Sequence, residues 1–397
     1  MPSTSNDIIY EFCAIFVTFS MIYAVSGVFG DVIRTFFMML SLTMLVVISL
    51  PSLRSDLNKI SFLYCLSITL GFVFHKILGL ETAKLFGEAL LRIVPVLVIA
   101  HYGHGRFYQN KHVRIFALAF FILECLLAIF EKLTLSHFVD YDSETQAMNV
   151  GMDFDEDFRA FSLMSHPLYN ANVVSIFLAF ILCSNTIRTI PKLILIFLGL
   201  GAIWAFNSRA CMLMWMFILV YRLFFYGKSL KWMVFSVCVL LLLLPTVFIY
   251  AKNNGLLGRL DFDFSDGSTL TRIWAFQIFF EYPWSFREMI MGGTILYYPG
   301  VMLKNSLDYV ALENGVLLDL GYWGFILGTI KIIGEIVITY TALYQFKIKD
   351  KLIIMMAMWG VAMMNNNSFN AFIMVFFMCS FLAFGLNQSC LGKYASR

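Results

Sequence analysis

The chain alternates between long apolar runs and short polar stretches over its whole length. A helix needs about 20 apolar residues to cross the hydrocarbon core of a membrane, and most of the runs are close to that length. The runs at 192–206 and 351–365 are shorter, and the run at 314–344 is longer. The twelve runs lie at 8–27, 31–50, 60–77, 83–101, 113–133, 168–186, 192–206, 209–226, 232–251, 314–344, 351–365 and 369–387. This pattern predicts an all-α fold, a polytopic bundle of about 12 transmembrane helices.

The composition points to the same class. Hydrophobic residues make up 60% of the 397 residues and charged residues only 13%, about half the share of roughly 25% in soluble domains. A soluble globule of this size would have too little polar surface to cover itself, which excludes a soluble enzyme. The net charge of +3 is too weak to indicate nucleic-acid binding. The eight cysteines lie mostly inside apolar runs without metal-ligand spacing, so we expect them to pack as small apolar residues.

Basic residues gather in alternate loops, which predicts the orientation of the chain. More than half of the 28 Lys and Arg residues lie in six short regions, after the second, fourth, sixth, eighth and tenth runs and at the C-terminus. By the positive-inside rule these regions face the cytoplasm, and an even number of spans then places both termini inside. His101, His104 and His112 fall in one of these regions, and we expect them to be solvated and without an acidic partner.

Two long loops, at 134–167 and 252–313, fall on the outer side. The first carries seven acidic residues and a single base, Arg159. The second is too aromatic to be disordered, and its stretch RIWAFQIFFEYPW is typical of an amphipathic helix at the membrane interface. Loops this long in a compact membrane protein are usually functional or disordered. They divide the chain into segments 1–133, 134–167, 168–251, 252–313 and 314–397.

Three arginines on the outer side are candidates for anion binding, because a guanidinium binds phosphate oxygens bidentately and keeps its charge. Arg209 lies in a very short turn between two apolar runs, where it either snorkels to the interface or clamps an anion. Arg272 follows Ser268 and Thr269, which we expect to cap a helix N-terminus, although an exposed loop arginine is the alternative. Arg159 follows the acidic run, so local pairing is its alternative role.

Polar residues at the outer ends of two spans complete the candidate set. His166 and Asn170 lie at the mouth of the span that begins at 168, close to Arg159 in sequence. Glu313 and Asn314 open the long run at 314–344, where Glu313 is either a partner of the helix dipole, a general base or a sugar-orienting group. Ionisable residues inside the spans are sparse, and snorkelling accounts for those near span ends; they include Lys84, Arg92, Glu124, Lys331 and Glu335.

The order of the polar motifs is more specific than any one of them. The acidic loop is followed by RAFSLMSHPLYNANVVSIFLAF, then by NSRACMLMWMF, then by the large outer loop with STLTRIWAFQIF and IMGGTI, and then by ALENGVLLDLGYWGFILG. The Ser-Arg turn between two closely linked spans is the most telling of these. In this order and on this side of the membrane, the motifs resemble those of the bacterial O-antigen polymerase and O-antigen ligase superfamily, over about residues 159–345.

The resemblance implies a membrane glycosyltransferase of the C type in the bacterial inner membrane, with both long loops periplasmic and carrying short helices. Such enzymes act on glycans linked to undecaprenyl diphosphate and need no metal or nucleotide cofactor. It implies two groups of site residues: Arg209, Arg272 and Glu313 as catalytic, and Arg159, His166, Asn170 and Asn314 as substrate-binding. Ligases typically carry a His before the Asn at the start of this late span. In this chain Glu313 stands before Asn314 at that place, which favours a polymerase.

We therefore predict a polymerase that transfers a growing glycan from undecaprenyl diphosphate onto a lipid-linked repeat unit. Its partners would be these lipid-linked glycans, the bilayer, a chain-length regulator and a flippase. The nearest alternative is a ligase that transfers the glycan to lipid A–core. A transporter is the alternative from another class. It should place its ionisable residues at mid-membrane depth, whereas most here cluster near the outer interface, and no internal repeat is visible.

Overall fold

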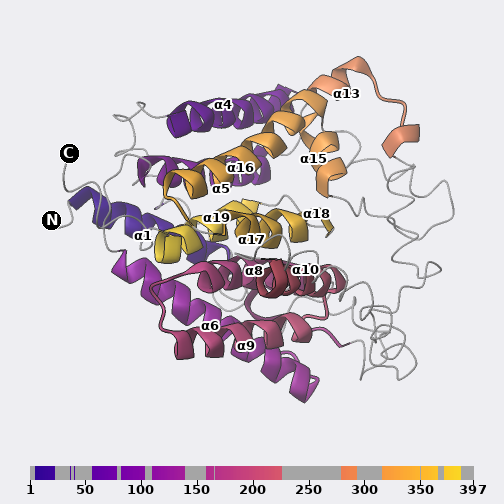
Figure 1. Ribbon diagram of the computed structural model, residues 1–397. Helices are drawn as coiled ribbons and strands as arrows, with labels where there is room; N and C mark the ends of the chain where they lie inside the picture. Colours follow the sequence, from indigo (N-terminus) through magenta and orange to yellow (C-terminus); the bar gives the residue numbers. More distant parts are fainter. Residues whose placement is uncertain are drawn as a thin grey trace.

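The computed structural model describes residues 5–22, 36, 40, 56–77, 82–102, 110–138, 158–164, 166–225, 279–292, 315–348, 350–364 and 371–385. Within these ranges the chain is helical and has no β-strand, which confirms the all-α class (Figure 1). Three helices of this part are long and apolar enough to cross a membrane: Lys59–Ile77, Lys111–Thr134 and Phe325–Gln345. Of the predicted span at 31–50 only residues 36 and 40 are described, and the predicted span at 232–251 lies outside the described residues.

The helices of the described part begin and end close to the predicted apolar runs. The first half of the chain forms α1 (Ser5–Ser20), α4 (Asp56–Ile77), α5 (Thr82–Tyr102), α6 (Lys111–Thr134), the short 3₁₀ turn η1 (Ser162–Met164), α8 (Pro167–Cys183), α9 (Thr189–Ala205), α10 (Arg209–Val220) and the π-helical turn η2 (Tyr221–Phe225). Apolar periodicity therefore located most of these helix ends to within a few residues, but α1 ends at Ser20 and not at the predicted residue 27.

The second half is more broken. It forms α13 (Phe286–Met291), α15 (Gly315–Trp323), α16 (Phe325–Gln345), α17 (Lys351–Met355), the π-helical turn η5 (Met356–Gly360), α18 (Val361–Met364), α19 (Ala371–Ser380) and the π-helical turn η6 (Phe381–Gly385). The runs predicted at 351–365 and 369–387 thus each contain a π-helical turn. Such turns are rare in proteins and often lie at functional positions.

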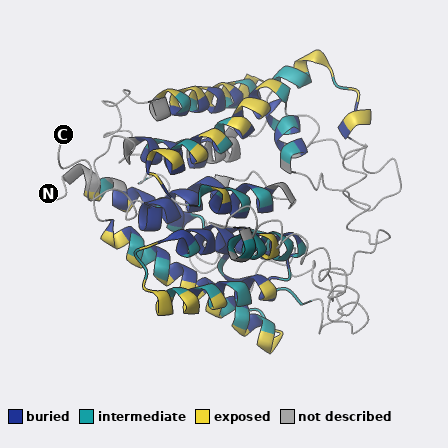
Figure 2. Ribbon diagram, viewed as in Figure 1, coloured by how far each residue is buried: buried dark blue, intermediate teal, exposed yellow. Residues whose placement is uncertain are grey.

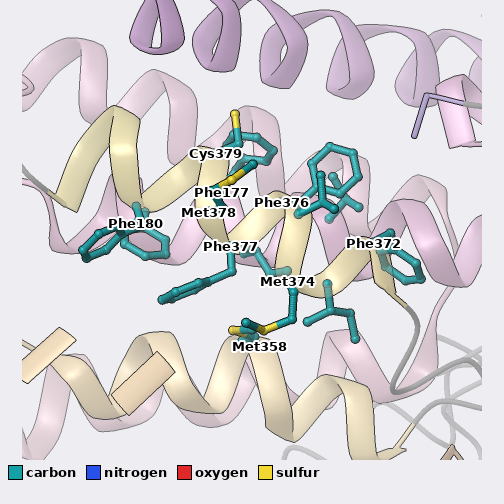
Figure 3. Close-up of a cluster of buried hydrophobic side chains, with 14 of the residues drawn as sticks. Phe177, Phe180, Met358, Phe372, Met374, Phe376, Phe377, Met378 and Cys379 are labelled. Atoms are coloured by element: carbon teal, nitrogen blue, oxygen red, sulfur yellow. The ribbon is translucent and has the colours of Figure 1, made fainter. Parts of the chain in front are cut away.

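Helix α19 lies at the centre of the bundle. Every residue from 372 to 385 is buried, and its aromatic side chains lie beside Phe177 and Phe180 of α8 (Figure 3). The ring of Phe376 lies 5.4 Å from that of Phe120 and 6.1 Å from that of Phe177. Because lipid is as apolar as these side chains, close packing and not burial from water holds such a core together.

The outer faces of the bundle are apolar as well. Figure 2 shows buried residues at the centre and exposed ones along the outer sides of α4, α6, α9 and α16. Large apolar side chains on these faces are exposed, among them Ile77, Leu133 and Phe197, the last at 72%. An apolar surface of this extent around an apolar core fits a bundle whose solvent is lipid. All six cysteines in the described ranges are free thiols, and five are buried, as expected.

The long run predicted at 314–344 is not a single helix. It breaks at Gly324, whose φ of 79° and ψ of 162° are open essentially only to glycine. Helix α15 folds back there onto α16, so that Asp319 meets Lys331. A Cβ atom on Gly324 would collide with the backbone oxygen of Ile290 in α13. Apolar periodicity runs through this break without interruption, which is why the sequence predicted one span.

Replacing Gly324 with alanine should destabilise the protein by about 1–3 kcal/mol or more, because backbone strain and the collision with Ile290 add. Gly201→Ala is the control. Gly201 lies inside α9, where a Cβ would be 3.2 Å from the Ile129 side chain, and the change should stay within about 1 kcal/mol. Denaturant or thermal unfolding in detergent micelles measures both. Equal stability of the two variants would mean that the break at Gly324 is not required.

Candidate functional site

Four helices meet at one end of the bundle: α6 and α9 end there, and α8 and α10 begin there. We call it the arginine end, because it holds Arg159 and Arg209. Segment 158–164, which carries Arg159, crosses this end between α6 and α8. The N–H of Ala160 donates to the backbone oxygen of Ala205, 3.2 Å away, at the last turn of α9. This hydrogen bond joins the segment that carries Arg159 to the end of α9, just before the turn that leads to Arg209.

Arg209 stands at the first position of α10, after a turn of only three residues. Helix α9 closes with Asn207 in the left-handed region at φ 50°, a conformation that asparagine tolerates. Ser208 is extended and precedes α10, and its backbone oxygen accepts from the N–H of Met212 at 2.9 Å. A positive charge at a helix N-terminus opposes the helix dipole. The tight turn predicted around Arg209 is confirmed, and its charge lies where it opposes the dipole of α10.

Helix α10 is attached to α8 by a small polar cluster. The indole N–H of Trp215 donates to Ser175 Oγ at 2.9 Å, and Ser175 Oγ lies 2.8 Å from Cys211 Sγ. All three side chains are buried. Because these contacts lie within two turns of Arg209, they fix its helix relative to α8.

Asn170 is a buried structural residue in this arrangement. Its Oδ1 accepts from the N–H of Met164 at 3.0 Å, and its Nδ2 donates to the backbone oxygen of Phe161. The amide therefore holds both sides of η1 against α8. Direct contact of Asn170 with substrate stays a prediction, and the structure shows the side chain occupied with the segment that carries Arg159.

His166 caps α8. Its Nδ1 accepts from the N–H of Leu168 at 3.2 Å, which requires the neutral imidazole. Burial, and then the positive charge of Arg159, lower the pKa of His166 to about 4. The imidazole also packs against Tyr169, with ring centroids 4.8 Å apart.

The cap makes stability depend on pH. The folded pKa of His166, about 4, lies below the ordinary value of 6.5, so as the pH falls from about 6.5 to 4 the unfolded chain binds a proton that the folded one does not. The contribution of His166 is complete above pH 6.5 and is lost on acidification. His166→Asn, which keeps a capping side chain that does not titrate there, should flatten this loss in melting curves from pH 4 to 7.5. A slope equal to that of the wild type would contradict this assignment.

Lys132 is a third cation at the arginine end, and the sequence did not single it out. Its Nζ donates to the backbone oxygen of Phe158 at 2.8 Å and lies 5.7 Å from the ring of Trp204. In the sequence it is one basic residue at the end of an apolar run, where snorkelling is a sufficient explanation. Only the folded chain shows that it lies beside the segment of Arg159.

Three predicted site residues, Arg272, Glu313 and Asn314, lie outside the described residues. The other four lie at the arginine end. Arg159, His166 and Asn170 come from one stretch of chain, which is hydrogen-bonded to the end of α9 just before Arg209. Among the residues that the structure describes, no group of three or more His, Cys, Asp or Glu side chains could hold a metal ion. The cations of the arginine end suit a multiply charged anion.

A second polar cluster lies inside the bundle, where α4, α5, α15 and α16 meet. The hydroxyl of Tyr64 donates to Glu335 Oε1 at 2.7 Å, and Arg92 Nη1 donates to the same oxygen at 3.2 Å. Lys331 pairs with Asp319 and lies 3.9 Å from Glu335. The charged side chains are between 0% and 9% exposed. We call these five residues the buried charge network.

Snorkelling, which the sequence predicted only for charged residues near span ends, does not describe Arg92, Lys331 or Glu335. Arg92 and Glu335 lie near the middle of α5 and α16, and each is paired with opposite charge on a neighbouring helix or turn. Two cations and two carboxylates balance one another. An intramembrane ion network is costly unless every member is paired, and such networks usually mark a functional position.

His112 differs from expectation. Its Nδ1 lies 3.2 Å from Glu11 Oε2, so the histidine has an acidic partner. Glu11 Oε1 accepts from the N–H of His112 at 2.7 Å and from that of Val113 at 3.1 Å. A carboxylate of α1 therefore caps the N-terminus of α6, a pairing between segments about a hundred residues apart that local sequence does not reveal.

Comparison with known proteins identifies no relative: no family model, curated protein or solved structure matches the chain.

Proposed function

We propose that the chain is a repeat-unit polymerase of surface polysaccharide, acting at the periplasmic face of a bacterial inner membrane. In this proposal the chain has about 12 spans, both termini are cytoplasmic, and the arginine end faces the periplasm. The proposal is carried by one observation: Lys132, the segment of Arg159 and the turn before Arg209 lie at the same end of an apolar bundle. Such a site suits the diphosphate of a lipid whose chains lie in the surrounding bilayer.

The proposed reaction is a displacement at the anomeric carbon of the donor glycan. A hydroxyl oxygen of the acceptor repeat unit forms the new bond to that carbon, and the bond to undecaprenyl diphosphate breaks with its electron pair. The hydroxyl proton passes to Glu313 in its predicted role as general base. Arg209 and Arg272 stabilise the charge that develops on the leaving diphosphate, without need for a metal cation.

The binding groups of the proposal are Arg159, His166, Asn170 and Asn314. Arg159 holds the diphosphate in the ground state, and the other three lie on the glycan side. Asn170 would act mainly through the backbone that it holds, since both its polar atoms are engaged there. The lipid-linked glycans, a flippase that delivers them and a chain-length regulator are the partners that this function requires.

A deletion strain tests this function and separates it from the ligase. Loss of a polymerase should leave single repeat units capping the lipid A–core, visible as one band above the core in a lipopolysaccharide gel. Loss of a ligase should leave the core without any cap. An unchanged ladder of chain lengths would overturn both assignments.

A transporter is the second candidate, and one specific observation favours it. The buried charge network lies at mid-helix depth, beside the break between α15 and α16, and broken helices with buried ionisable groups are typical of transporters. Mid-membrane depth is where the ionisable residues of a transporter are expected. A Glu335→Gln variant that folds, retains a normal polymer ladder and loses solute flux in vesicles would favour this candidate over the polymerase.

A further inference from the structure

The two described ends of the first long loop are tied together by one buried carboxylate. Glu131, in the last turns of α6, is 0% exposed. Its Oε1 accepts from the N–H of Phe138 at 3.0 Å, on the chain entering the loop. Its Oε2 accepts from the N–H of Phe161 at 2.7 Å and from that of Ser162 at 3.0 Å, on the chain leaving it. A single side chain thus accepts hydrogen bonds from three backbone N–H groups, one on the segment that enters the loop and two on the segment that leaves it.

Neighbouring groups extend this contact. Glu124, two turns earlier on α6, accepts from the N–H of Leu163 at 3.1 Å, and its backbone oxygen accepts from Ser162 Oγ at 3.0 Å. His137 stacks on the ring of Phe161 with centroids 4.3 Å apart, and its Nδ1 lies 3.7 Å from Glu131 Oε2. The same face of α6 therefore holds the segment over consecutive residues.

Arg159 lies only two residues before Phe161 in this segment. Backbone hydrogen bonds to a charged acceptor are stronger than neutral ones, and buried ones define position closely. The hydrogen bonds from Phe161 and Ser162 to Glu131 therefore fix the backbone from which the side chain of Arg159 extends. A displacement of about 1 Å at a binding group is enough to reduce catalysis strongly.

We infer that Glu131 is a positioning residue for the arginine end: it fixes segment 158–164 and so holds Arg159 where it binds the anionic headgroup of the substrate. The inference rests on the proposed function for the identity of that headgroup. Glu131 does not touch the substrate. It acts through the backbone, and Glu124 supports it from the next turns of the helix.

Glu131→Gln is the test variant, because it keeps the shape but turns one acceptor into an NH₂ donor facing backbone N–H groups. Glu11→Gln is the matched control. Glu11 accepts two backbone N–H groups at the opposite end of the same helix, at 2.7 and 3.1 Å. Both variants lose the same kind of bond, so a general loss of stability affects both alike.

Hydrogen exchange of the purified full chain in nanodiscs is the first measurement. In Glu131→Gln the amides of Phe138, Phe161 and Ser162 should exchange about tenfold faster or more, the change expected when a buried hydrogen bond is lost. They should stay at the wild-type rate in Glu11→Gln. Unchanged exchange in Glu131→Gln overturns the inference without touching the proposed function.

Steady-state kinetics with undecaprenyl-diphosphate-linked repeat units, extracted from the deletion strain, is the second measurement. Glu131→Gln should raise KM about ten- to hundredfold while kcat changes by less than about threefold, since Arg159 acts in binding. The double variant Glu131→Gln with Arg159→Ala should be no worse than Arg159→Ala alone, because both remove one interaction. Additive losses, or a normal KM in Glu131→Gln, overturn the inference. A normal KM in Arg159→Ala overturns the proposed role of the arginine instead.

Discussion

Replacing Arg209 with alanine should abolish chain elongation while the protein remains folded and inserted. Arg209 stands at the first position of α10, where its charge opposes the helix dipole, so its removal should not cost helix stability. If it stabilises the leaving diphosphate, its loss should lower the rate by roughly 10²–10³-fold, as for other groups that stabilise charge in the transition state. Arg272→Ala should behave in the same way.

The measurement is the chain-length ladder of lipopolysaccharide at matched expression. Arg209→Lys should restore little, because an ammonium is a point charge and lacks the planar fork of the guanidinium. Arg188, exposed at the opposite end of α9, is the control, and Arg188→Ala should leave the ladder intact. Full activity of Arg209→Ala and Arg272→Ala would remove the diphosphate clamp from consideration.

The second large effect is expected at Lys331, in the buried charge network. Its ammonium pairs with Asp319 and lies 3.9 Å from Glu335, and the side chain is 0% exposed. Lys331→Met should destabilise the protein by about 3–5 kcal/mol, because it leaves a carboxylate buried without its cation. The loss should release α15 from α16, since Asp319 is the member of the network on α15.

A double variant separates charge balance from packing. Lys331→Met with Asp319→Asn removes one charge of each sign and leaves the Arg92–Glu335 pair in place, so it should recover most of the lost stability. Unfolding in detergent micelles measures both variants against Lys347→Met, which changes an exposed lysine just after α16. If the double variant is as unstable as Lys331→Met, the network does not act through its charge balance.

The helix positions followed from apolar periodicity because each helix needs only its own residues to be recognised. The same reasoning failed at Gly324, where the run at 314–344 breaks. The backbone there has a conformation that a glycine allows but does not require, and its cause is the packing of α13 and α15 on α16. Local pattern does not contain that packing.

Candidate residues divide in the same way. The tight turn at Arg209 could be predicted, because the apolar runs at 192–206 and 209–226 leave only two residues between them. The cap formed by His166 could have been suspected from its place before Pro167 at the start of an apolar run. Glu131 and Lys132 could not be found. Both are charged residues near the end of a predicted span. Their partners, Phe138, Phe158 and Ser162, belong to the loop that follows.

Composition and the spacing of apolar residues were enough to predict a membrane protein, its all-α fold and most helix ends in the described part. The pairing of the buried charges became visible in the folded chain. Tyr64 and Arg92 lie on the successive helices α4 and α5, and Glu335 lies on α16, 243 residues after Arg92. A single charge in a span is compatible with either snorkelling or function. The pairing of charged side chains depends on the distances between helices, and these distances cannot be read from the order of residues along the chain.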